Sequence, residues 1–396
     1  MSDAKKLENF SYLLKLLSCA LNDTEIPQPN ESIDWALVFS LAKSHSVAGM
    51  AYCAIKKHSF ENLPPKNVLA DFKEYYEYQL LTDFNVDVET EDILREMAEK
   101  KLYAMPLKGY LLKHDYPVPA MRTMSDVDIL YKESQQEAVK ALFLERGYSF
   151  NPLLCGEMEF TKGEFHHYEL QANLCDEDRA SYDFFSNIWE RVSFIDGYRA
   201  RMSLEDYYLY LLEHLASHFE NGGVGLRMFM DVYVFMKKHG KELDEAYLTD
   251  SLNKLKLKDF RVSAEKLSNE WFCDNSSADL GSPITEFIMD SQTYGRLEYN
   301  IVMNTVRREE KSGKRISPLK NLLCKIFPNY RYIAKRYPIA QKHKILYPFC
   351  IVRMWVGRIF ARNINTKGIK NYLIPTDSDI AKSYKAILTD MGLDRR

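Results

Sequence analysis

Asp126 and Asp128, separated by a single residue, are the side chains in this sequence whose type and spacing best suit chemistry. They stand at the start of an apolar run, 127–131, that predicts a short strand. Alternate residues of a strand share a face, so the two Cα atoms are expected about 6.6 Å apart on one side. Both carboxylates can then converge on a hard cation such as Mg²⁺ or Mn²⁺. The alternative interpretation is a surface strand that carries two solvated aspartates.

A lysine–glycine turn precedes the aspartates. Residues 102–107 predict a short buried strand, and Gly109 opens a short helix or turn directly after Lys108. A glycine at a strand-to-helix turn lets backbone amides approach a phosphate, and the start of a helix favours anions. Lys108 would add a point charge to such a site. In the alternative interpretation Gly109 only makes a tight turn possible.

A third carboxylate is expected if two metal ions are held. Glu169 is the best candidate, because it lies in an expected strand, 165–171, and faces opposite to the apolar Leu170. Glu159 and Glu164 are rivals on neighbouring strands. For each of them the alternative is an exposed glutamate without a function.

The segments around these residues predict an α+β fold. Residues 1–100 are predicted to be helical, with Ser32 as the N-cap of one helix. Short strands and helices alternate over 101–200, and helices return over 201–310. The remaining part, 311–396, is a basic, aromatic-rich region. We therefore expect a small mixed-sheet core embedded between mainly helical N- and C-terminal segments.

The composition excludes several classes of protein. The 396 residues are 46% hydrophobic and 13% aromatic, which excludes wholesale disorder. The seven cysteines are scattered without a Cys-x-x-Cys pair, so we expect reduced thiols. The N-terminal segment lacks the apolar centre of a signal peptide, and no stretch reaches the roughly 18 apolar residues of a spanning helix. We expect a cytoplasmic protein without a transmembrane segment.

The charge is distributed unevenly along the chain. The net charge is −3, yet residues 311–376 hold 15 Lys and Arg and no Asp or Glu, with aromatic residues between them. This region could bind a polyanion such as RNA, lie on an anionic membrane surface, or pack against the acidic remainder of the chain. We favour the last, because charge runs are most often structural or solvated. In addition, Arg353, Arg358 and Arg362 do not share one narrow helical face, which argues against an interfacial helix.

Two histidines on a predicted helix, His214 and His218, have the i, i+4 spacing of zinc ligands. The residue after His214 is a leucine, so the motif His-Glu-x-x-His is absent, and no third ligand is apparent. We favour the alternative that both histidines form hydrogen bonds to a neighbouring part of the fold. Arg227 and Asp231 are also four residues apart, which predicts a helical ion pair.

Together these residues resemble an uncharacterised bacterial nucleotidyltransferase family within the polymerase-β-like nucleotidyltransferase superfamily. The family pattern corresponds here to Leu107-Lys108-Gly109, Arg122 and Asp126-Val127-Asp128-Ile129-Leu130. Further matches are Asp34-Trp35, Leu41-Ala42, His45-Ser46-Val47, His214, His218, Arg227 and Asp231. The third acidic position of the family, in Glu-Leu-His, corresponds to Glu169.

The resemblance implies a two-metal transfer of a nucleoside monophosphate from an NTP, such as ATP, to an acceptor. Asp126, Asp128 and Glu169 would be catalytic and hold Mg²⁺ or Mn²⁺, and Glu169 could also take the acceptor's proton. The nucleotide-binding residues would be Lys108, Gly109, Arg122 and Ser125. The possible pocket residues are His214, His218, Arg227 and Asp231.

The acceptor is left open by the sequence, since a small molecule, a protein or an RNA end would all suit this core. Two positions depart from the expected pattern: Tyr110 stands where the superfamily usually has a serine after the glycine, and Gln171 stands where the family has a histidine. They motivate the alternative of a catalytically degenerate nucleotide-binding or regulatory module. A polyanion- or membrane-surface adaptor that uses 311–376 is a further alternative.

Overall fold

The computed structural model describes residues 3–57, 62–152, 157–177, 179–273, 281–293, 295–360 and 370–394. Arg362 and the adjoining part of the basic region lie outside the described residues. The expected α+β fold is confirmed: a five-stranded mixed sheet lies between helical segments. Within the described residues, no helix combines the length and the apolar character needed to cross a membrane.

Four helices form the N-terminal part, namely α1 (Asp3–Asn22), α2 (Trp35–Ser44), α3 (Ala48–Ile55) and α4 (Lys66–Glu99). The prediction that Ser32 caps the second helix is wrong. Asp34 is the N-cap and accepts a hydrogen bond from the backbone of Leu37, because its carboxylate lies closer to the unpaired amides of the first turn. The Ser32 hydroxyl instead bonds to Asn30 at 2.8 Å.

The sheet has the strand order β1-β2-β5-β4-β3. Its strands are β1 (Ala104–Pro106), β2 (Val127–Tyr131), β3 (Ser149–Pro152), β4 (Met158–Lys162) and β5 (His166–Gln171). Only the β2–β5 pair is parallel among these neighbours. Between the strands lie α5 (Lys108–Leu112), η1 (Lys113–Asp115), η2 (Pro119–Met121), η3 (Glu133–Gln135) and α6 (Gln136–Glu145). The parallel pair therefore encloses the crossover through α6, β3 and β4.

One face of the sheet is apolar and packs against α4 and α6. Val127, Ile129 and Tyr131 of β2 join Tyr168 and Leu170 of β5 in a buried cluster with residues of both helices. Alternation along the strands consequently directs the polar residues of β2 and β5 to the opposite face. Two turns, α7 (Tyr182–Phe185) and η4 (Ile188–Glu190), and the short strands β6 (Ser193–Phe194) and β7 (Ala200–Arg201) complete this part.

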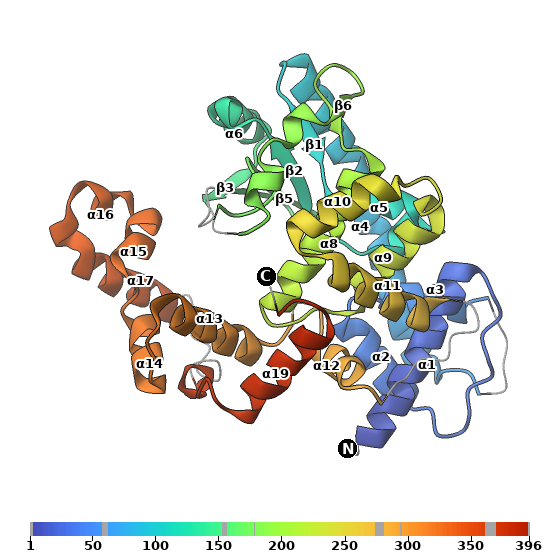
Figure 1. Ribbon diagram of the computed structural model, residues 1–396. Coiled ribbons are helices and arrows are strands. Elements are labelled where there is room, and N and C mark those ends of the chain that lie inside the picture. Colours follow the sequence, from blue (N-terminus) through green and yellow to red (C-terminus); the bar gives the residue numbers. More distant parts are fainter. Residues whose placement is uncertain are drawn as a thin grey trace.

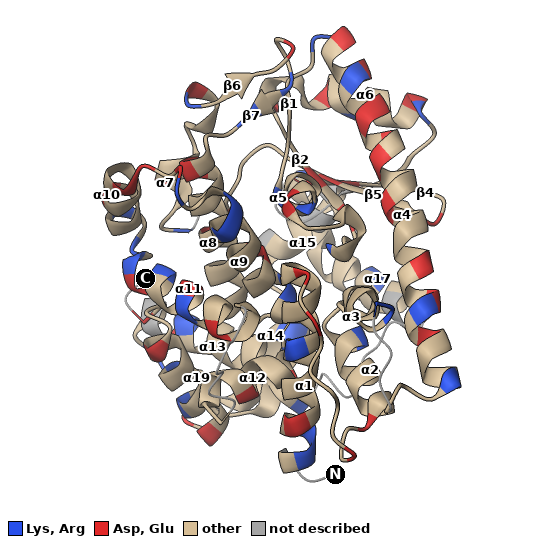
Figure 2. Ribbon diagram, turned by 90° about the vertical axis from the view of Figure 1, so that its right-hand side faces the viewer, with Lys and Arg blue, Asp and Glu red and all other residues tan. Residues whose placement is uncertain are grey.

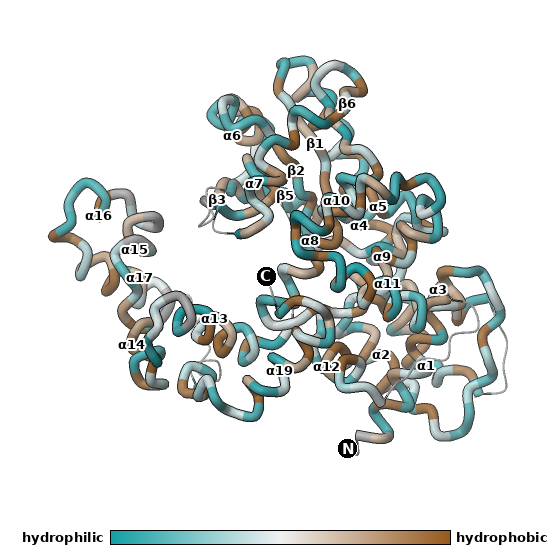
Figure 3. Tube along the Cα trace, viewed as in Figure 1, coloured by the Kyte–Doolittle hydropathy of each residue, from teal (hydrophilic) through white to brown (hydrophobic). Residues whose placement is uncertain are grey.

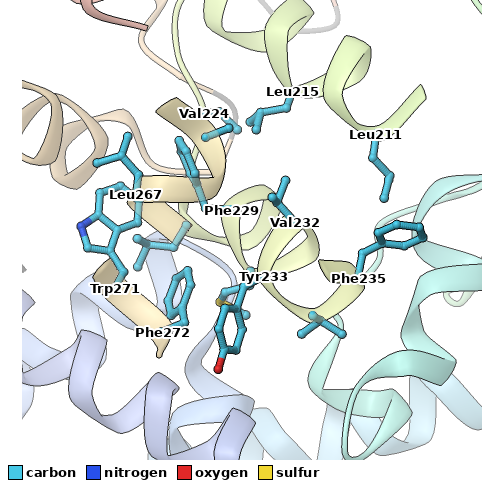
Figure 4. Packing of buried hydrophobic residues seen from close by; sticks show 14 of the residues in the cluster. Leu211, Leu215, Val224, Phe229, Val232, Tyr233, Phe235, Leu267, Trp271 and Phe272 are labelled. Atoms are coloured by element: carbon cyan, nitrogen blue, oxygen red, sulfur yellow. The ribbon is translucent and has the colours of Figure 1, made fainter. Parts of the chain in front are cut away.

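A helical body faces the polar side of the sheet. It contains α8 (Leu204–Glu220), α9 (Leu226–His239), α10 (Glu245–Leu255), α11 (Lys258–Phe272) and α12 (Pro283–Ser291). Its core is continuous with that of α1–α3. Figure 4 shows the packing around Phe229 of α9, whose ring meets Trp271 edge-on at 4.9 Å between centroids. Burial of such aromatic pairs fixes α9 against α11.

The C-terminal part extends away from the rest of the chain and then returns (Figure 1). Its elements are α13 (Leu297–Ser312), α14 (Pro318–Ile326), α15 (Tyr330–Arg336), α16 (Pro338–Lys342), η5 (Lys344–Leu346), α17 (Tyr347–Phe360), η6 (Lys370–Leu373) and α19 (Asp379–Asp390). On α19, Tyr384 is fully buried and its hydroxyl donates to the carbonyl of Phe219. The division of the chain at 100, 200 and 310 stays a prediction.

Candidate active site

Three predicted site residues lie on the polar face of the sheet. In the parallel register, Asp128 of β2 stands beside Glu169 of β5. Asp126 precedes Asp128 by two residues, just before the strand begins, and strand alternation gives it the same face. Figure 2 shows the acidic positions of β2 and β5 next to each other. The fold thus brings together carboxylates that are far apart in the sequence.

The carboxylates influence one another strongly. Burial, together with the negative charges of Asp126 and Asp128, raises the pKa of Glu169 to about 7. Burial also raises the pKa of Asp128, and Asp126 adds to this shift while Lys108 opposes it. Such mutual repulsion marks a face with an excess of negative charge. A divalent cation would relieve that excess, so the donor set fits a metal that binds oxygen ligands.

Lys108 faces this cluster from the turn that follows β1. Its ammonium lies 2.7 Å from Oδ1 of Asp128, and both side chains are mostly buried. Burial disfavours the ammonium, but the Asp128 carboxylate outweighs burial and holds the pKa of Lys108 above its usual range. The backbone of Lys108 is left-handed, with a φ of 45°. The hydroxyl of Tyr207 donates to its carbonyl at 2.7 Å, which ties the turn to α8.

Arg122 is held away from the carboxylate cluster by Asp231 of α9. Nε and Nη2 of Arg122 donate to the two carboxylate oxygens of Asp231 at 2.9 and 2.7 Å. Tyr116 donates to the same carboxylate at 2.7 Å. Gly109 lies over this guanidinium so closely that a Cβ atom there would be 2.5 Å from Nη1 of Arg122. The glycine is therefore required for packing, whatever its role toward a nucleotide.

A cavity of about 240 Å³ lies beside the start of β2. Arg122, Ser125 and Arg227 line it, opposite Tyr75 and Gln79 of α4. The hydroxyl of Ser125 also lies 3.1 Å from Oδ1 of Asp126. Three of the residues predicted to bind the nucleotide or line its pocket therefore line one cavity, and Ser125 connects that cavity to Asp126.

A sequence model of the uncharacterised nucleotidyltransferase family matches residues 31–273. The chain belongs to this family. The matched part runs from α2 to α11 and includes the whole sheet, whereas the C-terminal part lies beyond it. No match was found among curated proteins or among solved structures.

The two histidines of this nucleotidyltransferase family member lie on α8, the helix that also contacts the Lys108 turn. Their rings meet edge-on at 4.6 Å between centroids. Burial, and next the positive charge of Lys108, lowers the pKa of His218 to about 4 and that of His214 well below its usual range. Both rings are thus neutral at pH 7 and close enough to Lys108 to respond to its charge. Within the described residues they form no metal-ligand group with a third side chain.

Sequence reasoning gave no role to His167, which lies on the same face of β5 as Glu169. His167 Nε2 is 2.8 Å from Oε1 of Glu159, and the potential ligand atoms of Glu159, His167 and Glu169 all lie within 4.8 Å of one another. Asp126 and Asp128 are not members of this group of three. Asp128 instead forms an ion pair with Lys108. Strand alternation alone could have placed His167 beside Glu169, since the two are separated by one residue.

Of the two rival glutamates, Glu159 joins the site and Glu164 does not. Glu159 pairs with Glu169 across the β4–β5 ladder. Glu164 lies in the turn between these strands, where it accepts a hydrogen bond from Tyr78 at 3.3 Å. Glu157, which the sequence did not single out, contributes a further negative charge: burial raises its pKa, and Asp128 is among the groups that act on it.

Proposed function

We propose that the protein is a cytoplasmic, divalent-metal-dependent nucleotidyltransferase that transfers a nucleoside monophosphate from an NTP, such as ATP, to an acceptor hydroxyl. The observation that carries the proposal is the register of the sheet, which sets Asp128 beside Glu169 on the face shared with Asp126. The family membership supports the reaction class. The acceptor, whether a small molecule, a protein or an RNA end, is not part of the proposal.

Asp126, Asp128 and Glu169 are the residues that would hold Mg²⁺ or Mn²⁺. When bound, the metal supplies positive charge for the triphosphate and lowers the pKa of the acceptor hydroxyl. Glu169, which stands beside Asp128 in the register of the sheet, would also accept the proton of the acceptor hydroxyl. In the structure, the ammonium of Lys108 compensates the negative charge of Asp128. The same ammonium would attract a phosphate of the bound nucleotide. The cavity beside Ser125 is the expected place for a part of the substrates.

The test is calorimetric titration of the purified protein with each NTP, with and without Mg²⁺. In the variant Asp126→Asn/Asp128→Asn, metal-dependent NTP binding should weaken at least tenfold. The matched control is Glu133→Gln/Glu137→Gln, which also removes two negative charges from the α/β part but at exposed positions outside the site. Its binding should equal that of the wild type. Unchanged binding in the aspartate variant, with the fold verified by circular dichroism, refutes the proposal.

Turnover distinguishes the enzyme from a degenerate module. The two residues that motivate the degenerate alternative, Tyr110 and Gln171, both form hydrogen bonds within the fold. Tyr110 donates to Glu91 at 2.9 Å, and Gln171 donates to Tyr210 at 3.3 Å. Labelled pyrophosphate release from γ-³²P NTP, measured with candidate acceptors, reports the reaction. Metal-dependent binding without any release in the presence of every acceptor class would favour the binding or regulatory module.

A further inference from the structure

The C-terminal segment α14–α17, hereafter the basic arm, lies outside the part matched by the family and has a small core of its own. Ile333 of α15, Ala340 of α16 and Met354 of α17 are buried in one cluster. The hydroxyl of Tyr330 donates to the carbonyl of Ala340 at 2.9 Å. The arm therefore has an inner side, which its core buries, and an outer side.

An apolar row runs along the outer face of α17. Phe349 is 71% exposed, Val352 61% and Val356 43%. Their spacing of three and four residues places them on one face of the helix, opposite the buried Cys350 and Met354. A helix that is apolar on both sides requires a second apolar environment for the side that the core does not cover.

Further exposed apolar residues lie elsewhere on the arm. Ile345, in the turn η5 that leads into α17, is 83% exposed. On α14 and at its C-cap, Leu319, Leu323 and Phe327 are 62%, 45% and 60% exposed. Figure 3 shows hydrophobic stretches in brown along the arm, from α14 to the segment beside α16. Exposed apolar residues at this density mark an interaction surface rather than the usual scatter of single side chains.

The charge of the arm is positive and largely uncompensated. The described basic side chains of the arm are exposed, and so are those that flank it: Lys320, Lys325, Lys342, Lys344 and Arg353 on the arm, and Lys314, Arg315 and Lys370 beside it. Among the described residues, the ion pair found for this set joins Arg315 to Asp377 at 3.8 Å. No described ion pair joins the arm to the acidic body, so the favoured expectation of packing against that body gains no support here.

Apart from Phe327 and Phe349, whose rings are exposed, the described aromatic rings of the arm are engaged in its packing, which argues against RNA as its partner. Trp355 is half-buried and its indole N–H donates to the carbonyl of Ile326 at 2.8 Å, and Tyr330 and Tyr347 pack against each other at 5.9 Å between ring centroids. Single-stranded RNA is bound through stacking on accessible rings. The accessible side chains here are instead mostly aliphatic, and aliphatic side chains bordered by lysines suit the headgroup–acyl boundary of a bilayer.

We infer that the basic arm docks on an anionic membrane surface. The row Phe349, Val352 and Val356, with Ile345, enters the boundary between headgroups and acyl chains. Lys342, Lys344 and the neighbouring basic residues attract the anionic lipids. This inference does not depend on the nucleotidyl-transfer chemistry, and its result leaves that proposal untouched.

The experiment is co-sedimentation of the full chain with lipid vesicles. Vesicles of 30% phosphatidylglycerol in phosphatidylcholine should bind at least tenfold more protein than phosphatidylcholine alone, and binding should fall as NaCl is raised from 50 to 500 mM. The variant Phe349→Ser/Val352→Ser should lose at least tenfold of this binding. The control Val88→Ser/Val262→Ser removes two comparably exposed apolar side chains (53% and 63%) from α4 and α11 and should bind like the wild type.

Charge and apolar contributions are separated by a second variant. Lys342→Gln/Lys344→Gln should reduce binding to anionic vesicles severalfold. Equal binding to both kinds of vesicle, no binding at 50 mM NaCl, or undiminished binding of the serine variant would overturn the inference. Light scattering would also overturn it if the wild type were a dimer and the serine variant a monomer. The apolar row would then contact a second copy of the chain. The inference would likewise be overturned if the protein bound an RNA oligonucleotide and did not bind vesicles. In that case the lysine variant would lose RNA binding and the serine variant would keep it.

Discussion

Replacing Asp231 by asparagine should destabilise the protein strongly, although the change is nearly isosteric. The carboxylate accepts two hydrogen bonds from Arg122 and one from Tyr116, and the side chains of Arg122 and Asp231 are only 8% and 6% exposed. Asparagine leaves the guanidinium buried without a counter-charge and turns one acceptor into a donor. Breaking a buried ion pair from one side costs about 3–5 kcal/mol, and we expect the free energy of unfolding to fall by that amount.

Guanidinium chloride denaturation followed by circular dichroism measures this loss. The control is Asp250→Asn on α10, which breaks an exposed i, i+4 pair with Lys254 (side chains 67% and 63% exposed) and should cost less than about 0.5 kcal/mol. The double variant Arg122→Met/Asp231→Leu should recover much of the loss, since no buried charge remains. A loss below about 1 kcal/mol in Asp231→Asn, or a double variant no better than the single one, would show that the reasoning about the buried charge is wrong.

Two further predictions concern the buried His45 and Gly109. The buried His45 accepts from the backbone of Leu226 at 3.4 Å and donates to Met289 O at 3.3 Å, and burial lowers its pKa to about 4. The contribution of the neutral His45 to the free energy of unfolding should therefore be full above pH 6.5 and fall by about 3 kcal/mol toward pH 4. His45→Gln, which cannot titrate, should remove that part of the pH dependence in denaturation curves, and an unchanged curve contradicts the assignment. Gly109→Ala should cost about 1–3 kcal/mol through its clash with Arg122, and the cost should shrink in an Arg122→Met background; equal costs in both backgrounds would refute the contact.

The sequence predicts those features that depend on neighbouring residues. Strand alternation within a few positions gives the shared face of Asp126 and Asp128, and the turn at Lys108-Gly109 follows from the glycine and the change of pattern. The buried contact of Arg122 with Asp231 spans 109 residues. No local periodicity specifies such a contact, because it depends on how α9 packs against the loop before β2. The sequence predicts an ion pair of Asp231 with Arg227, four residues before it on the helix. In the structure both carboxylate oxygens of Asp231 accept hydrogen bonds from Arg122.

His45 shows a similar limit. The family resemblance included it within His45-Ser46-Val47, but the pattern gave no reason for a histidine at that position. The reason is tertiary: the ring bridges the ends of α9 and α12, whose partner atoms lie 181 and 244 residues further along the chain. In the basic arm the sequence shows the many basic and aromatic residues. Only the packing of the arm shows which of its apolar side chains are buried and which are exposed to solvent.

The parallel pairing of β2 with β5 has a consequence for biosynthesis. Asp126 and Asp128 leave the ribosome well before Glu169, and a parallel pair cannot form until the crossover through α6, β3 and β4 has been made. Contacts of such sequence separation form slowly in folding. Tyr207 of α8, which holds the turn at Lys108, is made later still. A nascent chain therefore carries an incomplete, mutually repelling set of acidic groups, and the metal and nucleotide binding that we propose should arise late in translation, after α8 has emerged.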